Sequence, residues 1–195
     1  FLDAGGGGSL EGAIEAVNYT TMMKVNMSSN SWGGGGFSEA LREAIVKARD
    51  AGILFVAAAG NDSGNNDQSP TYPASYEVEN VLTVAAIDNR DAIARFSNYG
   101  TRTVHVAAPG VKVYSTVKGG KYDSFSGTSM ATPHVAGIAS LLLAANGTWD
   151  FSMLKNRLIR TSIPVHGLKR KVTAKGRVNA YNAFHDIVTP SPEPD

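Results

Sequence analysis

Two continuous apolar runs constrain the fold of this chain more than any other feature. Ile53 to Ala59 reads Ile-Leu-Phe-Val-Ala-Ala-Ala, and Val81 to Ile87 reads Val-Leu-Thr-Val-Ala-Ala-Ile. Apolar and polar side chains do not alternate in either run. A strand of this kind is buried on both faces, as in a parallel sheet covered by helices on two sides. Shorter runs over Val104–Ala108 and Val111–Val117 predict further strands of the same type.

Helical patterns separate these strands. Apolar residues recur at helical spacing after Ser38, which is a suitable N-cap, and Gly52 is suited to the position just beyond the end of the helix. A short helix is expected over Ser9–Ala16, after a run of glycines that we expect to be flexible. Helix and buried strand in alternation predict an α/β domain with a mainly parallel sheet.

Two more helices are expected in the second half of the chain. Met130–Ala145 is apolar on nearly every side, as in a helix buried at the centre of a domain. Phe151–Ile159 is amphipathic, with Leu154 and Leu158 on its inward side and Lys155 on its outward side. We assign residues 1–188 to one domain and residues 189–195, which are rich in proline, to a tail or linker.

Composition excludes several classes of protein. The 195 residues carry 18 Lys and Arg against 17 Asp and Glu, a net charge of +1, so no basic surface for nucleic acid is expected. The absence of cysteine excludes disulfides and thiolate chemistry. No apolar run reaches the roughly 18 residues of a membrane-spanning helix, so none is expected.

Ser129 is the first candidate for chemistry. It lies in Gly127-Thr128-Ser129-Met130-Ala131-Thr132-Pro133-His134, directly before the long apolar helix. The free N–H groups and the dipole of a helix N-terminus favour negative charge, which suits a nucleophile whose reaction forms an oxyanion. An ordinary N-cap serine would give the same local pattern, which leaves both interpretations open.

Asn61 is the second candidate, because it follows the first buried strand at its carboxyl end, where open α/β sheets place their sites. An asparagine amide there can donate to a developing oxyanion. A simple turn asparagine before Asp62-Ser63-Gly64-Asn65 explains the same residues, and taken alone this second interpretation is the stronger one.

Taken together and in this order, the segments of the chain resemble the subtilisin-like serine proteases from about Lys24 to the last helices. The most specific match is Gly127 to His134. The other segments are Ser31-Trp32-Gly33, Ala57 to Asn61, Tyr72-Pro73-Ala74, Val81 to Ala86, Phe96-Ser97-Asn98-Tyr99-Gly100, Ala107-Ala108-Pro109-Gly110 and Gly176 to Ala180.

The resemblance implies a three-layer subtilisin-like fold and a secreted or extracellular serine endopeptidase that acts on polypeptides. It makes Ser129 the nucleophile and Asn61 an oxyanion donor, with the Ser129 N–H as its companion. In the family, the substrate lies as an extended strand between two segments, which correspond here to Ser31–Gly35 and Ala57–Gly60. The implied substrate-binding residues are Ser31, Trp32, Gly33, Ala58 and Gly60.

The family's other two catalytic residues are missing from this sequence. The triad runs Asp, His, Ser along the chain, but neither the aspartate nor the histidine motif occurs, and none of the four histidines precedes Asn61. His134 lies about 140° around the helix from Ser129 and about 7.5 Å along its axis, so it cannot be the base. We therefore expect an N-terminal fragment of the same protease, as an upstream segment or separate chain, to supply the Asp and His. This chain would lack the N-terminal part of the fold and be inactive alone.

Two alternatives remain. A subtilase-like fragment without catalytic competence, or a module that only binds protein, would also lack the base. Gly127-Thr128-Ser129-Met130-Ala131 also approaches the nucleophile elbow of α/β-hydrolases, in which Asp and His follow the serine. That elbow requires a buried strand before the serine, whereas Gly119–Ser124 is polar.

Calcium is common in the family that the chain resembles. Two carboxylates that help to hold one such ion correspond here to Thr103 and His105, which are poor ligands for a hard cation. The aspartates in loops, at positions 62, 67, 88 and 91, are better explained as solvated side chains. We therefore assign no metal site and no cofactor to this chain, and expect any structural calcium mainly on the upstream part.

Overall fold

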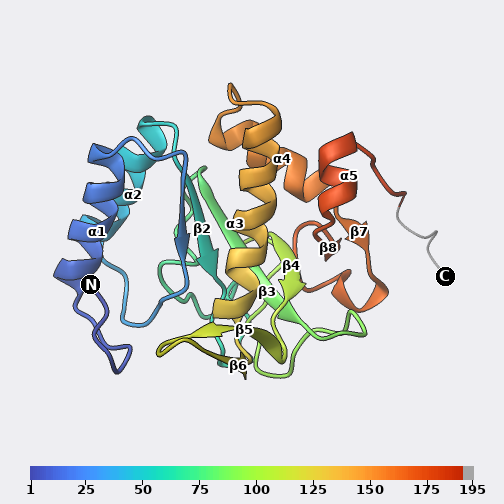
Figure 1. Ribbon diagram of the computed structural model, residues 1–195, viewed down its shortest axis with the longest axis horizontal. Helices are drawn as coiled ribbons and strands as arrows, with labels where there is room; N and C mark the ends of the chain where they lie inside the picture. The colour runs from blue at the N-terminus through green and yellow to red at the C-terminus, as the bar shows by residue number, and fades with distance from the viewer. Residues whose placement is uncertain (191–195) are drawn as a thin grey trace.

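A six-stranded sheet forms the middle layer of the structure, a computed structural model that describes residues 1–190 (Figure 1). The first four strands are parallel neighbours, β8 continues the sheet in parallel, and β7 pairs with β8 in the opposite direction. This confirms the mainly parallel sheet. The strands, in sheet order, are β1 (Met27–Asn30), β2 (Leu54–Ala58), β3 (Val81–Ile87), β4 (Val106–Pro109), β8 (Gly176–Arg177) and β7 (Ile163–Pro164).

Helices cover both faces of the sheet. Leu54 and Val56 of β2 pack in one apolar cluster with residues of α3 and α4, whereas Phe55 and Ala57 pack in another with residues of α1 and α2. Every residue of β2 and β3 is buried, as their sequences predicted. The helices are α1 (Leu10–Met22), α2 (Glu39–Asp50), α3 (Thr128–Ala145), α4 (Phe151–Arg160), α5 (Ala180–His185) and the short 3₁₀ helix η1 (His166–Leu168).

The ends of α2 are those that the sequence predicted, but α1 is longer than expected. The Ser38 hydroxyl accepts a hydrogen bond from the Leu41 N–H, and Gly52 adopts a φ of +81° just beyond the helix. Helix α1 continues past Ala16 to Met22. Its last turns contain Thr20 and Thr21, whose hydroxyls donate to the Val17 carbonyl at 2.7 and 3.2 Å. Threonine has a low helix propensity, and these bonds satisfy its hydroxyl group within the helix.

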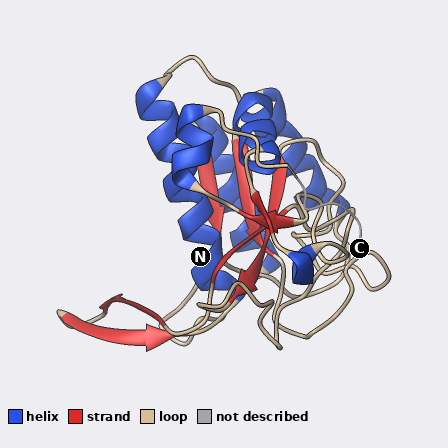
Figure 2. Ribbon diagram, turned by 90° about the vertical axis from the view of Figure 1, so that its right-hand side faces the viewer, coloured by secondary structure: helices blue, strands red, loops and turns tan. Residues whose placement is uncertain are grey.

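The prediction of a buried strand over Val111–Val117 is wrong. Strands β5 (Val113–Val117) and β6 (Lys121–Phe125) form an antiparallel hairpin that projects from the body of the molecule (Figure 2). Most of their residues are exposed. The rings of Tyr114 and Tyr122 stack across the hairpin with centroids 5.6 Å apart, so cross-strand contact replaces burial in the core.

Helix α3 is also less buried than expected. One side packs against β1, β2, β3 and β4, but Pro133, His134 and Gly137 are exposed, and Leu141 is 58% exposed. Among residues 1–190, α3 alone is long and apolar enough to cross a membrane by length and composition, a test that core helices also pass. The expectation of burial on nearly every side fails because no described residue covers this surface.

Lys155 and His105 each make a hydrogen bond with the backbone that the sequence did not predict. The Lys155 ammonium, expected to face solvent, donates to the Glu79 and Val81 carbonyls at 3.0 and 2.7 Å. His105 Nδ1 accepts a hydrogen bond of 2.9 Å from the Thr83 N–H, so its ring is neutral. Burial, assisted by the positive charge of Lys155, lowers the pKa of His105 to about 3.

We expect this histidine to make the protein less stable in acid. The unfolded chain protonates His105 near pH 6.5 and the folded chain only near 3, so the contribution is complete above pH 6.5 and is lost as the pH falls. His105→Asn keeps a hydrogen-bond acceptor but does not titrate. Between pH 7 and 5 the free energy of unfolding of this variant should fall by about 2 kcal/mol less than that of the wild type.

Urea unfolding at the two pH values measures this difference. His166→Gln, at an exposed histidine, is the matched control and should keep the wild-type dependence. Equal acid sensitivity in His105→Asn and the wild type would contradict the prediction.

Candidate active site

A pair of hydrogen bonds joins the end of β2 to the start of α3. Asn61 Oδ1 accepts from the Thr128 N–H at 2.9 Å and from the Thr128 hydroxyl at 3.0 Å. Because a backbone N–H can only donate, the side-chain atom of Asn61 that faces it must be the oxygen. The amide nitrogen Nδ2 therefore points away from Thr128, and Asn61 is an exposed residue.

Two N–H donors face the same small space beside Ser129. A methyl carbon placed on Gly127 would lie 3.7 Å from the Ser129 nitrogen and 3.8 Å from Asn61 Nδ2. Ser129 is the second residue of α3, where backbone N–H groups have no partner within the helix. The two donors and the helix dipole together make this space favourable for a negatively charged oxygen.

The Ser129 hydroxyl lies in a reciprocal contact with Ser31. Ser129 Oγ donates to the Ser31 carbonyl at 3.2 Å, and Ser31 Oγ donates to the Ser129 carbonyl at 2.9 Å. No imidazole within residues 1–190 hydrogen-bonds to Ser129. His134 is exposed, with its Nδ1 2.8 Å from the Met130 carbonyl oxygen.

A cavity of about 810 Å³ adjoins these groups. The five residues implied for substrate binding, Ser31, Trp32, Gly33, Ala58 and Gly60, all line it together with Asn61 and Ser129. The structure therefore brings every sequence-predicted site residue to one place, although their roles remain predictions. Asp62 lines the same cavity and contributes an acidic group to its wall.

The start of the chain also lines this cavity, which the sequence reasoning missed. Phe1, Leu2 and Gly6–Gly8 contribute to the wall, and the Phe1 ring meets the Trp32 ring edge-on at 5.2 Å. The glycine run is a defined turn, not the flexible segment we expected, because the Asp3 carboxylate accepts from the Gly5 and Gly7 N–H groups. The available signal was Asp3, two residues before the glycine run.

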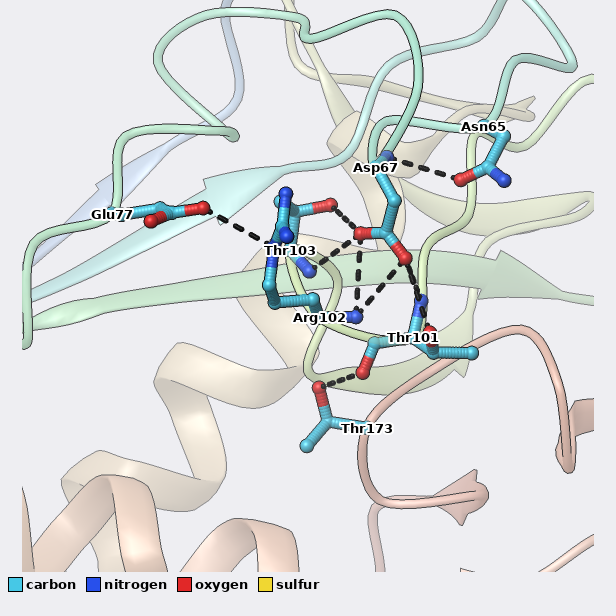
Figure 3. Close-up of polar contacts among 7 residues, drawn as sticks. All are labelled: Asn65, Asp67, Glu77, Thr101, Arg102, Thr103 and Thr173. Atoms are coloured by element: carbon cyan, nitrogen blue, oxygen red, sulfur yellow. Dashed lines mark hydrogen bonds and ion pairs between the residues drawn. The ribbon is translucent and has the colours of Figure 1, made fainter.

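The loop that follows Asn61 is fixed at its far end by Asp67 (Figure 3). The Asp67 carboxylate accepts from the N–H groups of Thr101, Arg102 and Thr103 and from both threonine hydroxyls. Burial alone would raise the pKa of Asp67, but the hydrogen bonds from Thr103, Arg102 and Thr101 together hold it below its usual value. Asp67 is therefore a structural carboxylate and not the solvated side chain that we expected.

The residues at the implied calcium position do not fit the ion. The Thr103 hydroxyl and N–H both donate to Asp67, and His105 Nδ1 accepts from Thr83. The Lys155 ammonium already occupies two neighbouring carbonyl oxygens. Within residues 1–190, no group of three or more His, Asp or Glu side chains could hold a metal ion.

Comparison with known proteins decides the family. The model of the subtilase family matches residues 1–184. The chain belongs to the subtilase family. Its relatives include Subtilisin-like protease 2 of Plasmodium falciparum, 37% identical over 91% of this chain and 14% of the relative. Subtilisin DY of Bacillus licheniformis is 40% identical over 83% of this chain and 58% of the relative.

Solved structures agree with the three-layer fold. A cold-adapted subtilisin-like serine proteinase aligns with a TM-score of 0.78 and 34% identity, over 91% of this subtilase chain and 62% of its own. The prenylagaramide maturation protease PagA aligns with the same TM-score at 27% identity, over 93% and 69%. The subtilase chain spans less than two thirds of the length of Subtilisin-like protease 2 and of Subtilisin DY.

Gly60 is a position at this site where a side chain would not be tolerated. Its φ is +108°, and a Cβ atom there would lie 2.5 Å from Asn98 Nδ2. Asn98 is 1% exposed and cannot move aside. Gly60→Ala should therefore lower the free energy of unfolding by more than about 3 kcal/mol, as backbone strain and a buried clash add.

Gly52→Ala is the matched control for Gly60→Ala. Gly52 has a φ of +81° with open space around it, so alanine there should cost only the backbone term of about 1–2 kcal/mol. Urea or thermal unfolding measures both losses, and equal losses would refute the clash with Asn98.

Proposed function

We propose that this subtilase chain carries the nucleophile and the oxyanion hole of a serine endopeptidase. The observation that supports this most is the convergence of Asn61 Nδ2 and the Ser129 N–H on one space beside the Ser129 hydroxyl. Membership of the subtilase family supports a serine peptidase with a polypeptide substrate. The bacterial subtilisins among its relatives are the basis for proposing an extracellular location.

In the proposed reaction, Ser129 Oγ bonds to the carbonyl carbon of the scissile peptide and gives its proton to a histidine. The carbonyl oxygen becomes an oxyanion, which Asn61 Nδ2 and the Ser129 N–H stabilise. The intermediate then breaks its C–N bond, and the histidine returns the proton to the leaving amine. Water hydrolyses the resulting acyl-enzyme by the same two steps.

The histidine and its aspartate have to come from outside these residues. The present acceptor of the Ser129 hydroxyl is the neutral Ser31 carbonyl, which cannot take its proton. We propose that an upstream segment, joined to this chain or separate from it, supplies both residues. The exposed face of α3 and the edge of β1 that pairs with no strand in residues 1–190 are surfaces for such a segment.

Ser129 should react with a serine-directed fluorophosphonate only when the upstream segment is present. Without a base the hydroxyl is a weak nucleophile, so the chain alone should neither be labelled nor cleave a fluorogenic peptide. The assembled protein should do both, and Ser129→Ala should abolish both. Intact-mass analysis of the labelled protein locates the adduct.

Labelling that survives Ser129→Ala would disprove the nucleophile, and activity of the purified chain alone would disprove the need for an upstream base. A folded assembly with Asp and His in place that neither reacts nor cleaves would favour the alternative of a protein-binding module.

Gly127→Ala should lower the activity of the assembled protein without unfolding it. The φ of Gly127 is 162°, an extended backbone that alanine adopts, and the nearest contact of the new methyl would be 3.6 Å. The methyl would occupy the space in front of both N–H donors, so kcat should fall at least about tenfold. Asn61→Ala, which removes one donor, should lower kcat by about 10²–10³ with little change in KM.

Gly167→Ala, in η1 with open space around it and on another element than α3, is the matched control. It should keep kcat and change the free energy of unfolding by no more than about 1 kcal/mol. Steady-state kinetics and thermal unfolding measure these effects, and an unchanged kcat in Gly127→Ala would contradict an oxyanion hole at this place.

A further inference from the structure

Asn98 lies behind the candidate oxyanion hole without lining the cavity. It follows β3 in the chain, is 1% exposed, and makes no hydrogen bond to Ser129 or to the Asn61 side chain. Its side chain nevertheless uses its full hydrogen-bonding capacity. Oδ1 accepts from the Asp62 and Gly64 N–H groups, both at 2.9 Å, and Nδ2 donates to Asn66 Oδ1 at 3.0 Å and to Thr71 Oγ1 at 3.2 Å.

Asn98 binds the residues on both sides of Asn61 in the chain. The Asn98 N–H donates to the Gly60 carbonyl at 2.9 Å, and Asn98 Oδ1 accepts from the Asp62 N–H. The residues before and after Asn61 are thus bound to the same buried side chain and its backbone. Thr128 fixes the side chain of Asn61, and Asn98 fixes the backbone of the residues before and after Asn61.

The chemistry requires this arrangement to be accurate. An oxyanion donor has to lie about 2.7–3.1 Å from the developing charge, and a misplacement of about 1 Å can cost 10²-fold in rate. Asn61 is exposed, so packing does not fix it. Only hydrogen bonds to its neighbours and to its own side chain can set the position of its amide.

We propose that Asn98 is a positioning residue for the oxyanion hole and acts on the reaction through Asn61. This inference rests on the proposed function. Asparagine suits the position because it offers two acceptor sites and two donors at the end of one short side chain. Aspartate would lose both donors, and alanine would leave the N–H groups of Asp62 and Gly64 unpaired.

The loop has attachments that do not depend on this side chain. The Ser63 N–H donates to the Phe96 carbonyl at 2.8 Å, and the Tyr99 N–H donates to the Gly64 carbonyl at 3.0 Å. A variant of Asn98 can therefore fold with the loop in place while the residues next to Asn61 are less firmly held.

A double-mutant cycle on the assembled protein tests the proposal. In the wild-type background, Asn98→Ala should lower kcat about tenfold or more, with KM changed less than threefold. In the Asn61→Ala background, the same substitution should lower kcat less than twofold, because the residue through which it acts has lost its donor. Asn98→Asp, close to asparagine in shape, provides a second cycle that should be non-additive in the same way.

Asn80→Ala is the matched structural control. Asn80 is a fully buried asparagine directly before β3 that donates to the Ile45 and Ile53 carbonyls and does not line the candidate site. Its loss should lower the melting temperature but leave kcat within twofold. All variants are assayed well below their own melting temperatures.

Each result has one meaning. Equal losses of kcat from the Asn98 substitutions in both backgrounds, or no loss in either, would overturn the positioning role. A large effect of Asn61→Ala with such additivity would leave the proposed function standing and remove only this inference. No effect of Asn61→Ala on kcat would overturn the oxyanion hole itself.

Discussion

The contact between Thr128 and Asn61 is the interaction on which the candidate site depends. It joins two segments that are 67 positions apart in sequence, the end of β2 and the first residue of α3. The Thr128 hydroxyl also accepts from the Gly60 N–H at 3.3 Å, so one side chain fixes both the amide group and the backbone before it. Without this contact, the Asn61 side chain would lose the partners that direct its Nδ2 away from Thr128.

The sheet behind this contact was the most predictable part of the fold. Uninterrupted apolar runs identify β2 and β3 because burial on both faces leaves no room for polar side chains, and Ser38 marks a helix start through its own hydrogen bond. The sequence was less informative where the environment is mixed. The residues of Val111–Val117 favour a strand both in a core and in an exposed hairpin, so they do not distinguish the two. The exposure of α3 depends on which segment covers it.

The sequence marked the candidate site residues individually but not the residues that support them. Ser129 and Asn61 stand at element ends, where the sequence marks them, and the resemblance gave them their proposed roles. Asn98 and Asp67 act through hydrogen bonds to backbone groups of distant loops, which leave no periodic pattern. Asn98 lies in one of the segments that carry the resemblance, Phe96–Gly100, but nothing in that segment indicates its hydrogen-bond partners. Lys155 was misplaced for a similar reason, because a lysine on a polar helix face can still reach inward.

The cation at the Glu79 and Val81 carbonyls is the Lys155 ammonium, which is part of the protein itself. A bound ion leaves its site when the medium is diluted or when a chelator competes for it. An ammonium on α4 is covalently attached, so its local concentration is set by the chain and not by the solvent. Dilution or an added chelator therefore does not remove the Lys155 ammonium from these two carbonyl groups.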